Sequence, residues 1–353
     1  MRLGTTESLL ERLGWDEAWE ASFAEPLERG LEPARVAVQH RGAYDVVGAD
    51  RELRVSAAAR LVRDGDLPAV GDWIGLDPAT GLIEALLPRR TSISRKDAYQ
   101  ATREQVLAAN VDVAFLVQAL PLDFNLRRLE RYLAMAWESG AQPFVLLTKV
   151  DLVDTVEAYL ADVEAVTLGS CPVLAVSART GAGLEELRSA LAVNRTAVLL
   201  GSSGVGKSTL VNALVGEELL ETREVREGDH RGRHTTTRRE LVLIPDGGIV
   251  LDTPGIRELQ LWDADLEQTF GDVEEIARRC RFSDCAHESE PGCAIRDSLA
   301  DGSLPAERWQ SYVKLQRELR ALEVRRNHLL RREQLRGYKI REREQRANPK
   351  KKR

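Results

Sequence analysis

A glycine-rich run has the residue types and the spacing of a phosphate-binding loop. It reads Gly201, Ser202, Ser203, Gly204, Val205, Gly206, Lys207, Ser208 and Thr209, so that Gly-Lys-Ser follows the first glycine after four residues. Glycines let the backbone curl around a phosphate, and backbone N–H groups at a helix start attract its charge. Lys207 should reach the β- and γ-phosphates, and the Ser208 hydroxyl should bind Mg²⁺. The run therefore predicts binding of a nucleoside triphosphate.

The flanking residues supply the elements that such a loop requires. Residues 196–200 are a short apolar run typical of a buried strand, and residues 208–214 begin a helical pattern. The alternative is a Gly/Ser-rich turn that matches by chance. A strand and a helix in the right places favour the phosphate loop.

A second polar motif follows the apolar run 143–147. Thr148, Lys149 and Asp151 are similar to the Asn/Thr-Lys-x-Asp motif with which GTPases recognise guanine. The carboxylate accepts hydrogen bonds from guanine N1–H and from its amino group, which adenine does not offer in that arrangement. Thr148 replaces the commoner Asn, which removes one side-chain contact and weakens the match slightly.

Two further motifs follow apolar runs. Ser177 and Ala178 resemble the loop whose backbone supports the base. Asp252, two residues before Pro254, and Gly255 resemble the GTPase motif in which the Asp holds Mg²⁺ through water and the Gly amide senses the γ-phosphate. Each match alone is weak, but their positions at the ends of expected strands strengthen them.

A polar loop at 227–237 is expected to act as a mobile switch. One of Thr235, Thr236 and Thr237 should bind Mg²⁺ in the triphosphate state, and we favour Thr236. Many GTPases place a water-orienting Gln after the Asp-x-x-Gly motif, but here the next residue is Ile256. His234 is therefore the candidate catalytic residue, the alternative being a polar loop with incidental histidines.

The order of these motifs carries the strongest resemblance. Usual GTPases begin with the phosphate loop and end with the base motifs, whereas this chain begins with the base motifs. It is thus similar to the circularly permuted GTPases. With a small barrel before and a cysteine cluster after, it resembles the family of ribosome small subunit-dependent GTPase A. That resemblance implies GTP hydrolysis coupled to late maturation of the small ribosomal subunit, with the subunit and its rRNA as partners.

Three cysteines and one histidine lie within fourteen residues. Cys280, Cys285, His287 and Cys293 form Cys-x4-Cys-x-His-x5-Cys, which completes a tetrahedral Zn²⁺ site with no open position and thus a structural one. Buried thiols without a metal are the alternative, although the segment is polar. The family resemblance implies the same four ligands. The fourth cysteine, Cys171, is expected to be a core or edge thiol.

The amino-terminal hundred residues predict a helix and then a small barrel. Residues 8–23 have helical spacing, and the period then changes to two. Five strands are expected, at residues 35–38, 43–47, 52–62, 72–76 and 82–87. Five short strands favour an oligonucleotide-binding (OB) barrel, with an SH3-like barrel as the rival. Residues 89–96 are interpreted as a basic linker.

The middle of the chain alternates apolar strands with helices. Strands are expected at 111–117, 143–147, 172–176, 196–200, 241–244 and 249–251, and helices at 125–139, 155–166, 183–191 and 208–214. This pattern predicts a mostly parallel, doubly wound sheet. The expected fold is an α/β P-loop GTPase domain, circularly permuted, between an OB-like barrel and a helical zinc-binding domain. The domain boundaries are placed at 1–96, 97–262 and 263–353.

Charge and composition predict where the protein acts and which class of molecule it binds. The net charge is −6, yet residues 325–353 hold thirteen Lys/Arg and three Glu, a net of +10. A basic tail on an acidic body is typical of nucleic-acid contact, although a solvated helix end is the alternative. The chain has no apolar run of membrane-spanning length and no signal peptide core, so a cytoplasmic protein without a membrane partner is expected. A monomer is expected, although the sequence does not determine the oligomeric state.

Two other functions remain open from the residues alone. The first is a P-loop ATPase or kinase acting on a small molecule, against which Asp151 argues. The second is an RNA-binding scaffold with nucleotide as a structural ligand. Competition between GTP and ATP would test the first, and a turnover assay would test the second.

Overall fold

The computed structural model describes residues 8–96, 104–216, 240–245, 247–252, 266–321 and 323–324. The chain forms two compact units. One comprises Met1–Ile93 and Val106–Leu259, and the other Ser94–Gln105 and Gln260–Arg353. Each unit is described by itself.

The first unit opens with three short helices where one helix was expected. They are α1 (Leu9–Arg12), α2 (Glu17–Ser22) and α3 (Ala24–Glu28). The expectation of one helix over 8–23 is wrong because two residues each start a new helix. Ser8 caps α1 in a capping box with Glu11, and Asp16 caps α2 by accepting from Trp19 N at 2.8 Å.

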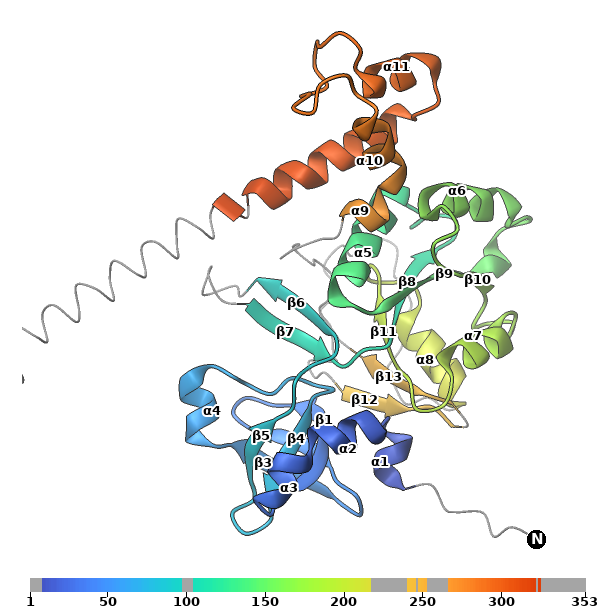
Figure 1. Cartoon of the computed structure of the whole chain (residues 1–353). Coiled ribbons are helices and arrows are strands. Elements are labelled where there is room, and N and C mark those ends of the chain that lie inside the picture. The colour runs from blue at the N-terminus through green and yellow to red at the C-terminus, as the bar shows by residue number, and fades with distance from the viewer. Residues whose placement is uncertain are drawn as a thin grey trace, which may run out of the picture. The chain divides into compact units, whose positions relative to one another are not determined.

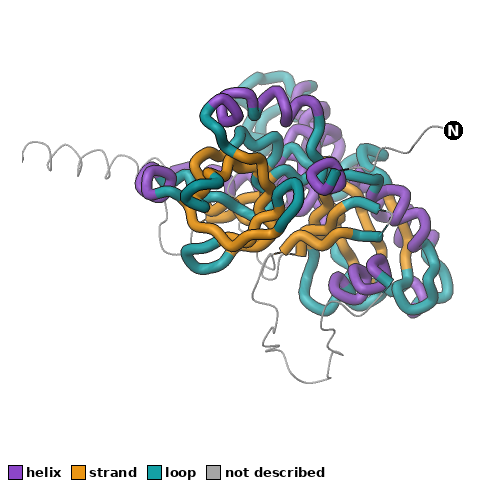
Figure 2. Tube along the Cα trace, turned by 90° about the horizontal axis from the view of Figure 1, so that it is seen from below, coloured by secondary structure: helices purple, strands orange, loops and turns teal. Residues whose placement is uncertain are grey.

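Five strands then form a closed barrel, which confirms that expectation. They are β1 (Glu32–Gln39), β2 (Tyr44–Val47), β3 (Glu52–Ala57), β4 (Trp73–Asp77) and β5 (Leu82–Leu86). They pair in the cyclic order β1-β2-β3-β5-β4-β1, with β3 and β5 parallel. Figure 2 shows the strands closing into a ring. This Greek-key order, with a helix between β3 and β4, is that of an OB-like barrel rather than the SH3-like rival.

That helix, α4 (Ala59–Asp64), corrects the expected strand 52–62. Strand β3 ends at Ala57, and the helix buries Leu61 in the barrel core. It ends at Gly65, whose φ of 86° is in the left-handed region that glycine adopts freely. A run of alanines has no strong strand preference, so the local sequence allowed both structures.

Part of the expected linker 89–96 is also regular structure. Residues Ser92–Lys96 form β6, which pairs with β7 (Glu104–Ala109) in a two-stranded sheet. Ahead of β6, Arg89 donates to both carboxylate oxygens of the fully buried Asp72, at 2.8 and 2.7 Å. The linker was predicted from the high Arg and Lys content of the segment, and charge content does not indicate whether a segment pairs as a strand. Strand β7 was not predicted.

The middle of the chain forms the expected sheet. Its strands are β8 (Val113–Ala119), β9 (Gln142–Thr148), β10 (Val173–Val176), β11 (Thr196–Leu200), β12 (Glu240–Leu243) and β13 (Ile249–Asp252). They lie in the order β10-β9-β8-β11-β13-β12, and every pair except β12–β13 is parallel. The strand that precedes the phosphate loop, β11, thus lies inside the sheet, with β8 on one side and β13 on the other.

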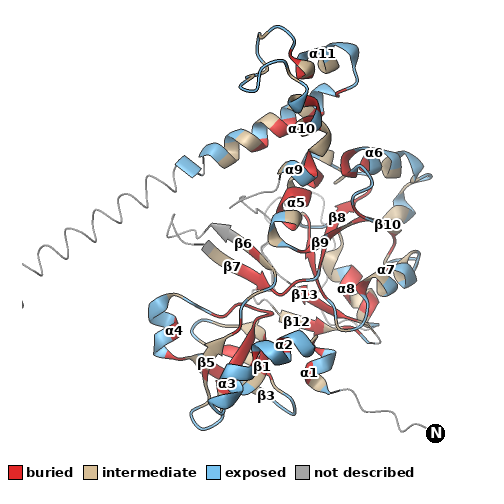
Figure 3. Cartoon of the chain, in the orientation of Figure 1, coloured by how far each residue is buried: buried red, intermediate tan, exposed pale blue. Residues whose placement is uncertain are grey.

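Helices cover this sheet. They are α5 (Leu126–Ser139), α6 (Glu157–Thr167), α7 (Leu184–Leu191) and α8 (Lys207–Val215). Apolar side chains of α7 and α8 form one buried cluster with β8, β11 and β13. Helices α5 and α6 pack on each other, α5 also on β8 and β9. Figure 3 shows the buried residues on the strands and on the inward sides of the helices.

The barrel and this sheet are continuous. Val38 of β1 pairs with Glu240 of β12, so the strands form a single eleven-stranded sheet (Figure 1). Arg35 fixes the junction from inside: it is 2% exposed and donates to the backbone oxygens of Leu13, Gly71 and Asn110. A buried cation without such acceptors would be strongly unfavourable. The barrel strands and the strands of the sheet are thus joined by hydrogen bonds between β1 and β12.

The second unit is largely helical. Its helices are α9 (Leu266–Thr269), α10 (Gly271–Arg278), α11 (Ala294–Asp301) and a helix over residues 306–321. The last of these packs on α10, since Arg308 donates to both carboxylate oxygens of Asp272 at 2.6 and 2.7 Å and Tyr312 contacts Phe270 edge to face. Among the described residues, no helix has the length and apolar character needed to cross a bilayer.

Candidate functional site: a nucleotide-binding edge and a cysteine–histidine cluster

The glycine-rich run lies between β11 and α8, as its sequence predicted. Gly201 cannot carry a side chain here, because a Cβ would lie 2.7 Å from the Val117 carbonyl oxygen. Gly204 and Gly206 have φ values of 80° and 96°, which side-chain-bearing residues rarely adopt. Gly206 precedes α8 and leaves its first N–H groups without a side-chain cap. The loop thus presents backbone N–H groups at a helix start, the arrangement that binds phosphate.

Lys207 folds back over this loop. Its Nζ donates to the carbonyl oxygens of Gly201 and Ser202, at 2.7 and 2.6 Å. The ammonium therefore lies within the curve of the loop, where a phosphate would be held. The two carbonyls fix the position of the cation.

The base motif is hydrogen-bonded to the phosphate loop. Thr148, the last residue of β9, donates through Oγ1 to Val205 O at 2.7 Å, and Lys149 donates through Nζ to Gly204 O at 2.7 Å. Lys149 has a φ of 59°, which turns its side chain back toward the loop. The Thr148 hydroxyl thus hydrogen-bonds the base motif to the phosphate loop, at the position where Asn is the commoner residue.

Asp151 and the loop after β10 meet beside this contact. Ser177 is fully buried and donates through Oγ to Asp151 Oδ1 at 2.6 Å, while Arg179 Nη1 lies 3.7 Å from Oδ2. The carboxylate is 15% exposed. Ser177 Oγ also accepts from Thr180 N, and Ala178 lies in the same turn. One carboxylate oxygen therefore accepts a hydrogen bond from Ser177, and the other lies near the exposed side chain of Arg179.

The remaining predicted residues are only partly described. Asp252 is the last residue of β13, whose neighbour β11 runs parallel to it into the phosphate loop. Strands that end at the same sheet edge place their following residues together. Gly255, His234 and Thr236 lie outside the described residues. Ser208 and Thr209 occupy the first turn of α8.

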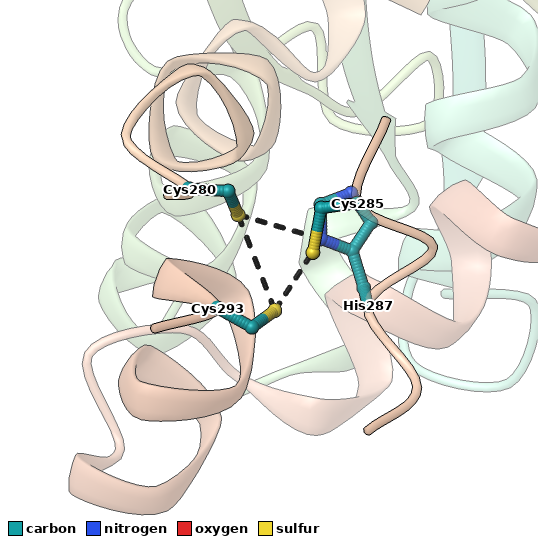
Figure 4. A group of neighbouring side chains, drawn as sticks. All are labelled: Cys280, Cys285, His287 and Cys293. Carbon is teal, nitrogen blue, oxygen red and sulfur yellow. Dashed lines mark hydrogen bonds between the residues drawn. The ribbon is translucent and has the colours of Figure 1, made fainter. Parts of the chain in front are cut away.

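The cysteine–histidine motif converges in the second unit. Figure 4 shows the side chains of Cys280, Cys285, His287 and Cys293 pointing toward one another. Their ligand atoms all lie within 4.8 Å, with His287 Nδ1 at 3.5 Å from Cys280 Sγ and 3.4 Å from Cys293 Sγ. Ligands at usual metal–S and metal–N bond lengths are about 3.6–3.8 Å apart in a tetrahedron. The cluster could therefore hold one metal ion.

Neighbouring groups shift the pKa values of two cluster thiols in opposite directions and fix the ligand loop, since burial raises that of Cys285 to about 11. Burial opposes ionisation of the Cys280 thiol, but the N–H groups of Ile295 and Ala294 at the start of α11 outweigh it and lower its pKa. Glu290 accepts from Ala286 N at 2.9 Å, and backbone N–H groups, its own first, lower its pKa to about 2. The Trp309 ring packs edge to face on His287, with centroids 5.5 Å apart.

Two residues beside the phosphate loop were missed from the sequence. Gln118 in β8 is fully buried, and Tyr132 in α5 is 4% exposed; burial raises the pKa of Tyr132, against a lowering effect of the Ser202 side chain. The available signal was the one polar residue in the otherwise apolar strand Val113–Ala119. A buried polar side chain within such a strand marks a position with a specific partner.

Comparisons with known proteins identify the family of this chain. A family model described as RsgA GTPase matches residues 86–262, half of the chain. The Small ribosomal subunit biogenesis GTPase RsgA of Streptomyces coelicolor is 47% identical over 322 residues, which cover 89% of this chain and 87% of that relative. The protein of the same name from Opitutus terrae is 45% identical over 328 residues, 88% of this chain and 89% of its own.

Solved structures show the same architecture. The crystal structure of YjeQ from Thermotoga maritima has a TM-score of 0.61 at 26% identity and covers 82% of this chain and 98% of its own. That of YloQ, described as a circularly permuted GTPase, has a TM-score of 0.58 at 23% identity and supports the fold alone. The permuted motif order, the site geometry and relatives more than 40% identical over most of both chains establish that this chain belongs to the RsgA GTPase family.

Proposed function

We propose that this GTPase binds the small ribosomal subunit and couples GTP hydrolysis to a late step of its maturation. The observation that carries the nucleotide assignment is the position of Asp151, fixed by Ser177 and adjoining a base motif bonded to the phosphate loop. The relatives' printed names refer to biogenesis of the small ribosomal subunit. Membership of a GTPase family argues against the small-molecule kinase or ATPase alternative.

The sequence motifs supply the proposed roles. Thr148, Lys149, Asp151, Ser177 and Ala178 recognise and support guanine. Phosphates are held by residues 201–209, with Asp252 and Gly255 at the γ-phosphate side. Ser208, Thr236 and Asp252 would hold Mg²⁺, which would neutralise charge on the phosphates. This set needs the helix-start N–H groups and the folded-back Lys207 that the structure describes.

The metal proposed for the cysteine–histidine cluster is one structural Zn²⁺. Three thiolates and one imidazole suit zinc and leave no open position for a substrate. The proposed organisation has a barrel at 1–96, a GTPase domain at 97–262 and a zinc-binding domain at 263–353. The protein is proposed to act as a cytoplasmic monomer.

A turnover assay tests the proposed function. Purified protein is incubated with GTP alone, with small ribosomal subunits or with large ones, and phosphate release is measured. We expect slow turnover alone, since the described site offers no arginine finger, and acceleration by small subunits only. Equal rates in all three reactions would contradict the ribosomal role, and no turnover in any of them would favour the scaffold alternative.

Hydrolysis is proposed to depend on His234. His234→Ala should leave nucleotide affinity near normal and lower the rate roughly 10²–10⁴-fold, the range for losing a group that handles a proton. Lys207→Ala, by contrast, should abolish tight nucleotide binding. Phosphate release and equilibrium binding separate the two effects. Undiminished subunit-stimulated turnover in His234→Ala would exclude this role.

The basic tail is proposed to contact rRNA phosphates. Ending the chain after Val324 removes a net charge of +10 but no nucleotide motif or cluster ligand. Basal hydrolysis should persist, subunit affinity should fall, and the salt dependence of binding should become shallower because fewer counterions are released. Filter binding across a salt series measures the slope, and an unchanged slope would show that the tail makes no phosphate contacts.

A further inference from the structure

Two ligands of the cysteine–histidine cluster are placed by helices, whereas His287 is not. Cys280 lies two residues after α10, and Cys293 is the N-cap residue of α11. His287 lies between them on a loop that faces these two cysteines (Figure 4), in a segment that is neither helix nor strand. Its φ of 61° is in the left-handed region that residues with a side chain rarely adopt. The position of this ligand therefore depends on contacts other than those of a helix or strand.

A single carboxylate supplies such contacts to the backbone around His287. Glu290 Oε1 accepts from Ala286 N at 2.9 Å. Its Oε2 accepts from Glu288 N and from Ser289 N, both at 3.0 Å. The loop is thus wrapped around the carboxylate, with bonded N–H groups on both sides of His287. Hydrogen bonds to an ionised acceptor are stronger than neutral ones, so they can hold a backbone conformation that is unfavourable by itself.

Glu290 acts on the loop and is not one of the cluster ligands. The ligand atoms that lie within 4.8 Å of one another belong to the three cysteines and His287. Both oxygens of Glu290 accept from backbone N–H groups instead. A further negative charge close to three thiolates is electrostatically unfavourable. The hydrogen bonds to the loop, rather than attraction to the cluster, therefore account for this carboxylate.

The position of the imidazole shows what the loop conformation achieves. His287 Nδ1 lies 3.5 Å from Cys280 Sγ and 3.4 Å from Cys293 Sγ. Nδ1 is the ring nitrogen nearer to the main chain, so a change of φ at His287 moves it directly. Trp309 contacts the ring edge to face, with centroids 5.5 Å apart, but it does not fix the backbone. The carboxylate and the indole thus hold different parts of the same ligand.

We propose that Glu290 is a positioning residue for the metal site: by accepting from N–H groups on both sides of His287, it holds this residue in the conformation that presents Nδ1 to the metal. Without the carboxylate, the helices still place Cys280 and Cys293, but the imidazole is no longer held beside them. Glu290 therefore decides whether the site has four protein ligands or three. The inference rests on the proposed zinc site and deepens it.

The first test measures zinc affinity of full-length variants by competition with a chromophoric chelator. Glu290→Ala removes all three hydrogen bonds to the loop and should lower the affinity about 10- to 100-fold, the usual effect of losing a group that orients a metal ligand. Glu290→Gln keeps one acceptor oxygen and should lose less. Unchanged affinity in Glu290→Ala would overturn the proposal, whereas wild-type protein without a zinc site would contradict the zinc assignment itself.

Glu288→Ala is the matched control. It removes the same charge from the same loop, but the Glu288 side chain is exposed and forms no hydrogen bond within the part of the chain that the structure describes. Its backbone N–H, which Glu290 accepts, is kept. Zinc affinity should therefore stay at the wild-type value. A loss as large as that of Glu290→Ala would mean that charge, and not the hydrogen bonds, is responsible, and would overturn the proposal.

A double variant separates positioning from folding. If Glu290 acts through His287, Glu290→Ala should have no further effect once His287→Ala has removed the imidazole. The double variant should then bind zinc as tightly as His287→Ala alone. Losses that multiply would instead show that Glu290 supports the whole unit, which would overturn the proposal.

The Co²⁺-loaded protein gives a readout that needs no second substitution. Glu290→Ala should keep the thiolate-to-cobalt absorption, because the three cysteines remain. The d–d bands should shift, because the imidazole no longer completes the tetrahedral site. The comparison decides the question even if His287→Ala fails to fold. Wild-type d–d bands in Glu290→Ala would show that His287 is held without the carboxylate and would overturn the proposal.

Discussion

Replacing Cys285 by serine should remove about one Zn²⁺ per chain and unfold the second unit, while nucleotide binding by the first unit persists. Structural zinc contributes about 10–16 kcal/mol in small zinc domains, which exceeds the whole stability of many domains, about 5–15 kcal/mol. The apolar core of the second unit is small, with Phe270, Val273, Ile276 and Ile295 among its buried residues. The metal is therefore expected to decide whether this unit folds.

Cys171→Ser is the matched control. This thiol is buried in the first unit, outside the cluster of the second unit, and burial raises its pKa to about 11. Elemental analysis gives the zinc content, and limited proteolysis reports the folding of the second unit. Wild-type protein without zinc, or Cys285→Ser with full zinc, would disprove the metal assignment.

Asp151→Asn should change the base that the site accepts. The Ser177 hydroxyl holds Oδ1 at 2.6 Å and would hold the amide oxygen of Asn in the same place. The amide NH₂ would then face the base, where it suits the 2-oxo group of xanthine and opposes the guanine amino group. We expect GTP affinity to fall roughly hundredfold or more, since a buried polar group is left badly paired, and xanthosine triphosphate to become a substrate.

Asp154→Asn provides the comparison for this change. Asp154 is exposed and three residues further along the chain, so the same loss of charge there should leave the preference for GTP intact. Competition between the two triphosphates gives the specificity directly. Full GTP preference in Asp151→Asn would mean that another group recognises the base.

The sequence by itself determined the parts that depend on near neighbours. The phosphate loop, the base motif and the Cys/His cluster each lie within about fourteen residues, and their chemistry follows from residue type and spacing. The same holds for β8 to β11, whose apolar runs are long enough to distinguish from loops. The permuted order of motifs was likewise readable, because it requires only their positions along the chain.

Local ambiguity explains the errors in the amino-terminal part. Residues 58–64 suit either a strand or a helix by propensity, and burial of Leu61 in the barrel core decided for α4. The pairing of β6 with β7 was not predicted, because the charged residues at the ends of these strands are also typical of a linker. In both cases contacts with other segments outweighed a weak local preference.

Only the tertiary structure decided the relations between distant segments. The parallel pairing of β3 with β5 made the barrel OB-like rather than SH3-like, and the pairing of Val38 with Glu240 joined it to the nucleotide-binding sheet. That Gln118 Nε2 has no hydrogen-bond partner among the described residues could not be read from residue type either, since most buried side-chain amides are paired. Register and hydrogen-bond satisfaction are properties of strands brought together from far apart in the chain, so spacing along the sequence does not contain them.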